Sequence, residues 1–383
     1  MSSSRLRKCT GCGEYWYCGA ACQKKQWEAH HRRVCKRIAR YNASVAVQAL
    51  AEHDRLDALL LSHVVAQLDD ETSASEAERI MALLPGPIEN PPSLPLVYTP
   101  SSTAARISPV ALYARFGNNN FVLHSHLTTF AHGVFPQASR YFNHSCMPNA
   151  AAKYALRTGE RPRMEVVALR DVAEGEEICL PYLDPALLQS KKEIFKYSYG
   201  FECRCPSCLF FDKAGKVTEP RSEEDNELAK KVLRFYESGP CDGLALVKLN
   251  HPPPADVLPA FHESFIMRLS QTFRDASHDG LYAKALDSGA SLLALYRLIY
   301  PPNYPQIGMH LLELAKTSWN SIVAGEVDRE TEERRKTLCR GYLDEATRIL
   351  GILGPEGDKD GPLVEMSTLH QILRTDNSSI VGR

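Results

Sequence analysis

A short segment in the middle of the chain gathers residues able to bind a polar ligand and a soft metal. It reads Arg-Tyr-Phe-Asn-His-Ser-Cys-Met-Pro-Asn over residues 140–149. Asn143 and His144 are able to hydrogen-bond a ligand, and the Cys146 thiol is a soft metal ligand. One alternative makes Cys146 a nucleophile activated by His144. The two side chains share a face of an extended chain, but their spacing does not put them in obvious hydrogen-bond geometry.

Three further cysteines form a tight group downstream, with the spacing Cys203-x-Cys205-x2-Cys208. Tetrahedral zinc takes four ligands, usually Cys or His, so this trio needs one more. Cys146 is the obvious candidate for the fourth ligand. The pattern therefore favours a metal site over a nucleophile at Cys146.

A second set of close-spaced metal-ligand types occupies the first forty residues. Its members are Cys9, Cys12, Cys18, Cys22, His30 or His31, and Cys35. Six ligands match neither one tetrahedral site nor two. One site is completed by Cys9, Cys12, a histidine and Cys35, which leaves Cys18 and Cys22 as half of another site.

The composition is that of an ordinary globular protein. The 383 residues include 45 Lys+Arg, 46 Asp+Glu and 44% hydrophobic residues, and this length indicates two or three domains. No apolar run approaches the ~18 residues needed to span a bilayer, and the first ten residues lack the apolar core of a signal peptide. We therefore expect a reducing compartment, nucleus or cytoplasm, where cysteines are thiols or metal ligands.

Charge is unevenly distributed along the chain. Residues 1–40 contain ten Lys and Arg against only Glu14 and Glu28, a net charge of +8 (10 − 2). Such a segment attracts nucleic acid or acidic protein, or it offsets the charge of zinc-bound thiolates. The sequence leaves both interpretations open.

The elements that position these residues follow from periodicity and from prolines. Residues 37–84 are helix-like, with Leu56, Leu59, Leu60, Val64 and Leu68 at helical spacing. Six prolines within 85–102 predict a loop, and 119–184 reads as short strands broken by turns, such as Asn120–His124 and Met164–Leu169. The pattern is helical from about 222 onward. The predicted helices there cover 280–299, 304–322 and 328–353.

The stretch from Cys9 to Cys35 resembles the second part of a MYND zinc finger. That family binds two zinc ions through four interleaved ligand pairs. In the family, the pair matching Cys18 and Cys22 shares its zinc with an earlier Cys-x2-Cys, which here would precede Met1. The distance from Trp27 favours His30 as the histidine ligand, whereas the distance to Cys35 favours His31, and we prefer His30.

Three motifs in order resemble the core and post-SET cysteines of a SET domain. They are Asn143-His-Ser-Cys-x-Pro-Asn149, Gly175-Glu-Glu-Ile-x3-Tyr182-x-Asp184, and Tyr199-x-Phe201-x-Cys203-x-Cys205-x2-Cys208. Together with the preceding finger and the helical C-terminal part, they make the chain similar to the SET-and-MYND-domain (SMYD) family, of a fungal type, over about residues 9–353.

The resemblance implies an α+β fold with small twisted SET-type sheets, a zinc-bound MYND-like finger and post-SET loop, and an all-α C-terminal domain like tetratricopeptide (TPR) repeats. A plain helical bundle is the alternative for that last domain. The implied domains are a partial MYND-type finger (9–35), a helical SET insertion with a Pro-rich loop (37–115), the SET core (116–184), the post-SET zinc region (185–212) and the helical C-terminal domain (222–383).

SET domains move a methyl group from S-adenosylmethionine to a lysine amine. The resemblance assigns Tyr182 to the hydroxyl that aligns the amine, and Tyr199 and Phe201 to the aromatic walls of the lysine channel. The implied donor-binding residues are Asn119 (or Asn120), Asn143, His144, Tyr182 and Phe201. The implied zinc ligands are Cys9, Cys12, Cys18, Cys22, His30, Cys35, Cys146, Cys203, Cys205 and Cys208.

The family also carries, ahead of the finger, a SET segment with a Gly-rich turn that contacts the methyl donor. Residues 1–383 contain neither this turn nor the first MYND Cys pair. The resemblance predicts a zinc-containing protein-lysine methyltransferase acting on histone or non-histone proteins. The alternative is a catalytically inactive interaction module, whose finger binds Pro-containing peptides. DNA binding by the basic finger is a third interpretation, and we expect a monomer without membrane association.

Overall fold

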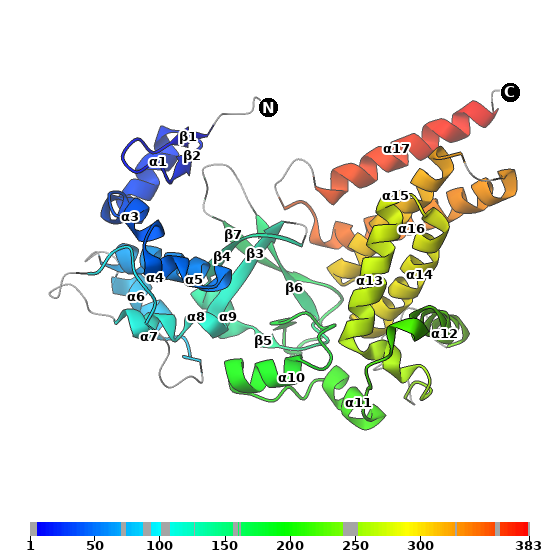
Figure 1. The fold of residues 1–383 in the computed structure, drawn as a ribbon, viewed down its shortest axis with the longest axis horizontal. Coiled ribbons are helices and arrows are strands. Elements are labelled where there is room, and N and C mark those ends of the chain that lie inside the picture. The colour runs from blue at the N-terminus through cyan, green and yellow to red at the C-terminus, as the bar shows by residue number, and fades with distance from the viewer. Residues whose placement is uncertain are drawn as a thin grey trace.

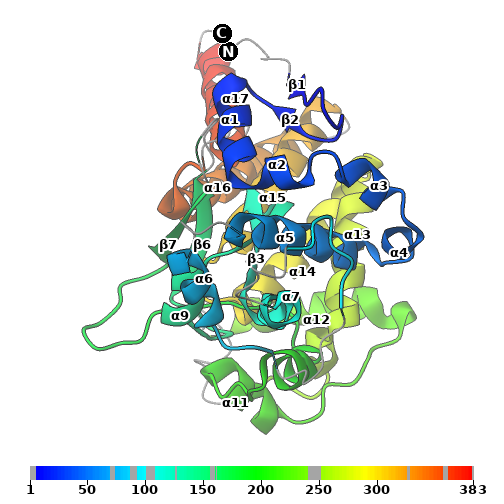
Figure 2. The same ribbon diagram turned by 90° about the vertical axis from the view of Figure 1, so that its left-hand side faces the viewer.

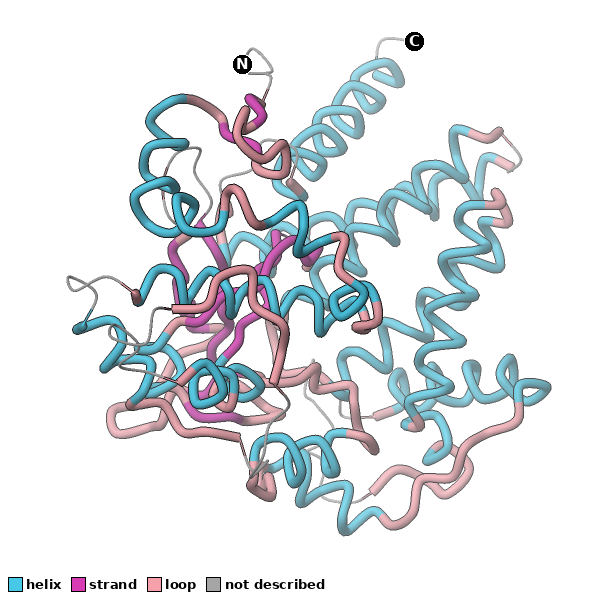
Figure 3. The backbone as a smooth tube through the Cα atoms, turned by 60° about the vertical axis from the view of Figure 1, so that its left-hand side comes forward, coloured by secondary structure: helices cyan, strands magenta, loops and turns pink. Residues whose placement is uncertain are grey.

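The computed structural model describes residues 6–69, 74–86, 93–100, 108–125, 127–155, 160, 162–239, 252–325, 328–356 and 361–381. Helices predominate, and the longer strands gather in the middle of the molecule (Figure 3). The N-terminal finger and the C-terminal helices lie on opposite sides of these strands (Figure 1). Within the described residues, none of the helices combines the length and apolar character needed to cross a membrane.

The finger is a two-stranded hairpin followed by short helices. Strand β1 (Arg7–Lys8) pairs antiparallel with β2 (Trp16–Tyr17), and Gly13 has a φ of 74° in the connecting turn. A positive φ favours Gly, which has no Cβ to clash. The chain then forms α1 (Ala20–Gln26), a π-helical turn η1 (Trp27–His31) and α2 (Arg32–Val34).

The stretch predicted to be helix-like from 37 to 84 is helical but divided. Its helices are α3 (Ile38–Asn42), α4 (Val45–Gln48), α5 (Glu52–Leu68) and α6 (Ala74–Met81). Ser44 interrupts the first two, because its side chain accepts a hydrogen bond from the backbone N–H of Val47 and caps α4. Leu56 of the predicted stripe is exposed, whereas the buried residues of α5 are Ala58, Leu61, Ser62, Val65 and Ala66. Two clusters cover α5, so its buried face differs from the one that leucine spacing suggests.

The described residues of the central part form three small two-stranded sheets. The antiparallel pairs are β3 (Asn120–Ser125) with β4 (Thr128–Val134), and β6 (Ala150–Ala155) with β7 (Arg163–Ala168). The parallel pair is β5 (Asn143–His144) with β8 (Cys179–Leu180). Strands β3 and β7 match the two predicted strands. The region also contains helices: α7 (Pro109–Tyr113) and α8 (Phe116–Asn119) precede β3, and α9 (Pro136–Tyr141) follows β4. Pro136 is the first residue of α9, a position where the backbone N–H that proline lacks would have no partner within the helix.

After the sheets the chain continues into helices, of which those from residue 222 onward lie in the part predicted to be helical. The elements are α10 (Lys191–Ile194), the π-turn η3 (Phe195–Tyr199), α11 (Pro206–Ala214), η4 (Ser222–Glu224), α12 (Asp225–Ser238), η6 (Leu258–Phe261), α13 (Glu263–His278), α14 (Tyr282–Ile299), α15 (Pro305–Val323), α16 (Arg329–Leu353) and α17 (Pro362–Val381). Figure 2 shows α13 to α16 as a stack behind α5 and β3. The helices at 280–299, 304–322 and 328–353 are confirmed within two residues as α14, α15 and α16. The TPR-like character and the domain boundaries remain predictions.

The helical part is hydrogen-bonded to the loops that follow the sheets. The Tyr300 hydroxyl donates to Asp184 Oδ1 (2.9 Å), two residues beyond Tyr182. The Glu263 carboxylate accepts the backbone N–H of Gln189 (2.6 Å) and of Ser190 (2.8 Å). These contacts attach both ends of the 184–190 segment to the helices, so the helical part helps to position Tyr182.

Candidate active site

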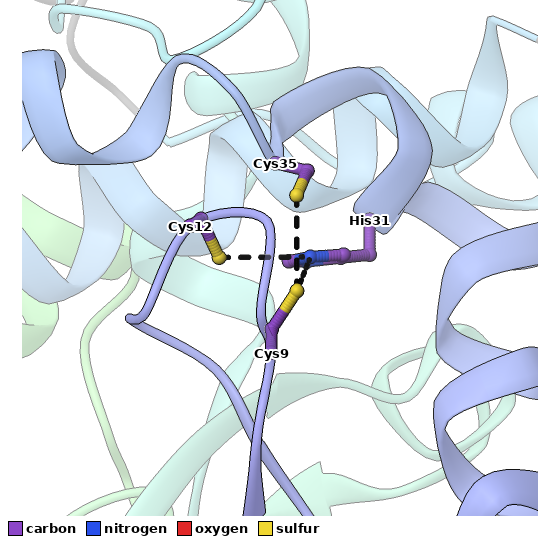
Figure 4. Close-up of side chains that lie close together, drawn as sticks. All are labelled: Cys9, Cys12, His31 and Cys35. Atoms are coloured by element: carbon purple, nitrogen blue, oxygen red, sulfur yellow. Dashed lines mark hydrogen bonds between the residues drawn. The ribbon is translucent and has the colours of Figure 1, made fainter.

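The finger brings four ligand atoms into one compact group (Figure 4). Cys9, Cys12, His31 and Cys35 each offer one atom, and all four atoms lie within 4.8 Å of one another. Cys9 Sγ is 3.8 Å from Cys35 Sγ and 3.4 Å from His31 Nε2. Two sulfurs each about 2.3 Å from a tetrahedral zinc lie ~3.8 Å apart, and a sulfur and an imidazole nitrogen lie ~3.6 Å apart. The donor set and its spacing therefore fit zinc.

The preference for His30 as the zinc ligand is wrong. His31 is fully buried and its Nε2 faces the three sulfurs, whereas the His30 ring packs 4.4 Å from the His63 ring, centroid to centroid. Positions four apart in a helix share a face, so His31 and Cys35 point the same way, and His30 is turned aside. Burial lowers the pKa of His30 to about 4, which keeps this ring neutral next to His63. The spacing from Trp27 gave the wrong histidine because η1 is a π-helical turn, which has more residues per turn than an α-helix.

Replacing His31 by Ala should release the zinc of the finger, whereas His30→Ala should retain it. Removing a ligand should cost more than the ~10–100-fold loss of affinity typical of a change outside the coordination sphere. The measurement is zinc per chain by mass spectrometry of the native protein after mild chelation. Equal zinc loss in the two variants would contradict the assignment of His31.

Cys18 and Cys22 remain a pair. Among the described residues, no third metal-ligand type joins them in a group. Their thiols are hydrogen-bonded to each other, which raises the pKa of Cys18. A zinc-binding role for this pair stays a prediction.

The second cluster joins residues more than fifty positions apart. The sulfurs of Cys146, Cys203, Cys205 and Cys208 lie within 4.8 Å of one another, and Cys146 Sγ is 3.8 Å from Cys208 Sγ. This again matches the edge of a zinc–sulfur tetrahedron, ~3.8 Å. Hydrogen bonds from the other thiols, that of Cys146 first, hold the pKa of Cys203 far below its ordinary value. The four sulfurs have the type and spacing of a metal site, so Cys146 is grouped with candidate metal ligands rather than with a nucleophile.

An aromatic group packs directly against this cluster. The Tyr182 ring lies 5.4 Å from the Tyr199 ring and 6.5 Å from the Phe201 ring, and the last pair is edge-on. Phe195 stacks on Phe201 at 4.9 Å and is itself buried against Cys146. Gly200, with a φ of 74°, turns the chain between Tyr199 and Phe201, so that both of their rings pack near the Tyr182 ring.

Hydrogen bonds hold both the hydroxyl and the backbone N–H of Tyr182. Its hydroxyl donates to the carbonyl oxygen of Phe142 at 2.7 Å. Its backbone N–H donates to His144 Nδ1 at 3.0 Å. Burial raises the pKa of Tyr182 to about 12, so the phenol keeps its proton at neutral pH. With that proton directed at Phe142, the oxygen's lone pairs are left to face a ligand.

His144 connects Tyr182 to the four-cysteine cluster. Because Nδ1 accepts the Tyr182 N–H, the neutral ring must carry its hydrogen on Nε2. That nitrogen lies 3.2 Å from Cys146 Sγ and donates to it. His144 is therefore a bridge between the cluster and the phenol, in addition to its predicted role at the donor. The sequence shows these residues as motif neighbours, but not this bridge.

Two cavities meet at the aromatic group. One, of about 1060 Å³, is lined by Asn143, His144, Phe201 and the segment that leads to Cys205. The other, of about 430 Å³, is lined by strand β3, Asp184 and Gln306. The residues that line both are Asn118, Asn119, Ser139, Tyr182 and Tyr199. Such volumes suit one organic ligand on each side.

The three adjacent asparagines at the start of β3 make different contacts. Asn119 lines both cavities, but its amide donates to the carbonyls of Arg115 (2.7 Å) and Leu84 (3.1 Å). Asn120 does not line the larger cavity, and its amide hydrogen-bonds to Asp57 (3.2 Å). Asn118 lines both cavities, and its buried Oδ1 makes no hydrogen bond within the part of the chain that is described. The buried Oδ1 of Asn120 also makes no hydrogen bond among the described residues, but Asn120 does not line the larger cavity. Sequence reasoning missed Asn118, since only packing shows which free amide oxygen belongs to a residue that lines both cavities.

Comparisons with known proteins agree with this fold. The SET domain model matches residues 22–183, and the MYND finger model matches residues 2–35. The histone-lysine N-methyltransferase ASHR1 of Arabidopsis thaliana is 23% identical over 412 residues, 89% of this chain and 80% of that protein. The histone-lysine N-methyltransferase SMYD1 of Homo sapiens is 24% identical over 386 residues, 88% of this chain and 74% of that protein.

A shorter but closer match is the histone-lysine N-methyltransferase ASHR2 of Arabidopsis thaliana, 30% identical over 146 residues, 37% of this chain and 35% of that protein. The fold, the two clusters and these matches define a zinc-binding SET-domain protein with a MYND finger. These matches over most of the chain support a protein of the SET-and-MYND-domain family.

Proposed function

We propose that this protein is a lysine N-methyltransferase that uses S-adenosylmethionine and acts on a protein substrate. The observation that carries the proposal is that Tyr182 and Tyr199 line both cavities. Two ligands that enter from opposite sides meet at these rings, as a methyl donor and an acceptor amine must. The names of the relatives, histone-lysine N-methyltransferases, make histones the first substrates to test.

The larger cavity suits the methyl donor. Asn143 and His144 offer polar groups at its wall, Phe201 offers an apolar face, and the free Oδ1 of Asn118 is an acceptor for an amino group. S-adenosylmethionine, when bound, supplies an activated methyl group on sulfur. The protein's part is to hold the donor and to exclude water from the junction with the smaller cavity.

The smaller cavity suits a lysine side chain. Tyr182 and Tyr199 give it aromatic walls where it meets the larger one, and such walls hold an ammonium by cation–π attraction. A free lysine amine has a pKa of about 10.4, so it must lose a proton before it attacks a methyl group. Its partial desolvation between these rings favours the neutral amine. The Tyr182 oxygen, anchored by its bond to Phe142, aligns that amine.

The finger is the proposed contact for a protein partner. Trp16 is 56% exposed, and Lys8 Nζ lies over its ring at 5.3 Å from the centroid. An exposed indole offers a flat surface on which a proline ring packs. A Pro-containing peptide is therefore the partner we favour, and duplex DNA is the competing ligand for the basic finger.

The direct test is calorimetric titration of the zinc-loaded chain with S-adenosylmethionine. Saturable one-to-one binding, competed by S-adenosylhomocysteine, followed by methyl transfer to histones or other proteins, is the expected result. A folded, zinc-loaded chain that binds no donor would contradict the proposed methyltransferase activity and favour a catalytically inactive interaction module.

A further inference from the structure

Lys191 is a cation in the protein interior without an obvious partner. This first residue of α10 is 2% exposed. Its Nζ makes no hydrogen bond within the described part of the chain. Burying an ammonium ion carries a penalty of several kcal/mol unless an opposite charge compensates it. The fold must therefore supply negative charge nearby.

The four-cysteine cluster packs against this face of α10. Phe195 follows Lys191 by four residues, so the two share one helix face. Phe195 packs in the same buried cluster as Cys146 and Cys208.

Lys191 acts electrostatically on both thiols. The pKa of Cys146 is raised mainly by its hydrogen bond to Cys203, and the charge of Lys191 opposes that rise. For Cys208, hydrogen bonding to Cys146 lowers the pKa, that to Cys203 and Cys205 raises it, and Lys191 lowers it.

The charge of a loaded cluster explains why a cation belongs there. One Zn²⁺ with four thiolates carries 2 − 4, a net charge of −2, in a buried position. The finger cluster, with three thiolates and one neutral imidazole, carries 2 − 3, a net charge of −1. The cluster with the larger excess of negative charge is the one that has a buried lysine beside it.

We propose that Lys191 is the built-in counter-cation of the zinc cluster formed by Cys146, Cys203, Cys205 and Cys208. It stabilises the loaded cluster by attraction through the low-dielectric interior rather than by a direct hydrogen bond. The cluster in turn compensates the buried ammonium. Because α10 runs directly into η3, which ends at Tyr199, this attraction also ties the channel wall to the cluster.

Lys192 provides a matched control. It is the next residue on the same helix and has the same side chain, but it is exposed and pairs with Asp212. Lys191→Met keeps much of the length of the side chain and removes its charge. Lys191→Arg keeps the charge.

The experiment measures the zinc affinity of each cluster in the full-length, zinc-loaded chain by chelator competition. Alkylation of the released thiols, read by mass spectrometry, shows which cluster has lost its metal. Lys191→Met should weaken zinc binding at the four-cysteine cluster by about 10–100-fold, as removal of outer-shell partners does. The finger cluster, Lys192→Met and Lys191→Arg should stay within a few-fold of wild type.

Two results would overturn the proposal. One is wild-type zinc affinity at the four-cysteine cluster in Lys191→Met. The other is an equal loss in Lys191→Arg, which would show that side-chain shape and not charge is needed. If Lys191→Met does not fold, Lys191→Arg decides alone, because retained affinity supports a counter-cation and lost affinity contradicts it.

Discussion

Replacing Tyr182 by Phe is expected to lower the rate of methyl transfer by ~100-fold or more, because misplacing a reacting group by about 1 Å has an effect of that size. The variant removes only the hydroxyl that donates to the Phe142 carbonyl. The ring contacts with Tyr199 and His144 are kept. The measurement is incorporation of labelled methyl groups into a histone substrate at saturating donor.

The same variant should leave the fold and the metal untouched. Zinc should remain at about two ions per chain, one for each cluster, and the thermal unfolding midpoint should move little. Tyr197→Phe is the matched control, because Tyr197 lies on the same π-turn as Tyr199 but is 65% exposed. Full methyl transfer by Tyr182→Phe would remove this hydroxyl from the mechanism.

Replacing Cys205 by Ser should remove one zinc ion per chain and disable the active site without touching the finger. The cluster ties the 203–208 segment to Cys146, which follows strand β5. Binding energies of structural zinc sites are on the order of 10–16 kcal/mol, and much of that is folding energy of the loop. Since Phe201 and Cys203 line the larger cavity, donor binding should fall together with the zinc.

The measurement pairs zinc stoichiometry with donor titration. Cys179→Ser is the control, because Cys179 lines the same cavity from β8 but is not a member of the cluster. It should keep both zinc ions. Unchanged stoichiometry in Cys205→Ser would refute the four-cysteine site.

Local patterns predicted much of the architecture. The helices α14 to α16 follow from apolar spacing within single segments, and strands β3 and β7 from short β-forming runs. Where a neighbouring segment decides which face is buried, the same reasoning fails. The helix α5 is the example: one cluster buries Ala58, Leu61 and Val65, a second buries Ala66, and Leu56 is left exposed.

The sequence by itself determined the chemistry of the ligands. Thiols at spacings such as Cys9-x2-Cys12 and Cys203-x-Cys205-x2-Cys208 specify zinc, because a loop of that length already brings sulfurs to one centre. The motif around Asn143 likewise predicted the family, which the comparisons support. Residue type and short spacing are local properties, and a sequence states them directly.

The tertiary structure alone decided the orientations and the long-range neighbours. It turned His31 rather than His30 to the sulfurs, left the Asn118 oxygen free, and buried Lys191 within electrostatic reach of Cys146 and Cys208. It also made Tyr182 the common wall of two cavities. These relations depend on how segments distant in the chain pack against one another. A side chain's direction is settled by that packing, which no spacing along the sequence records.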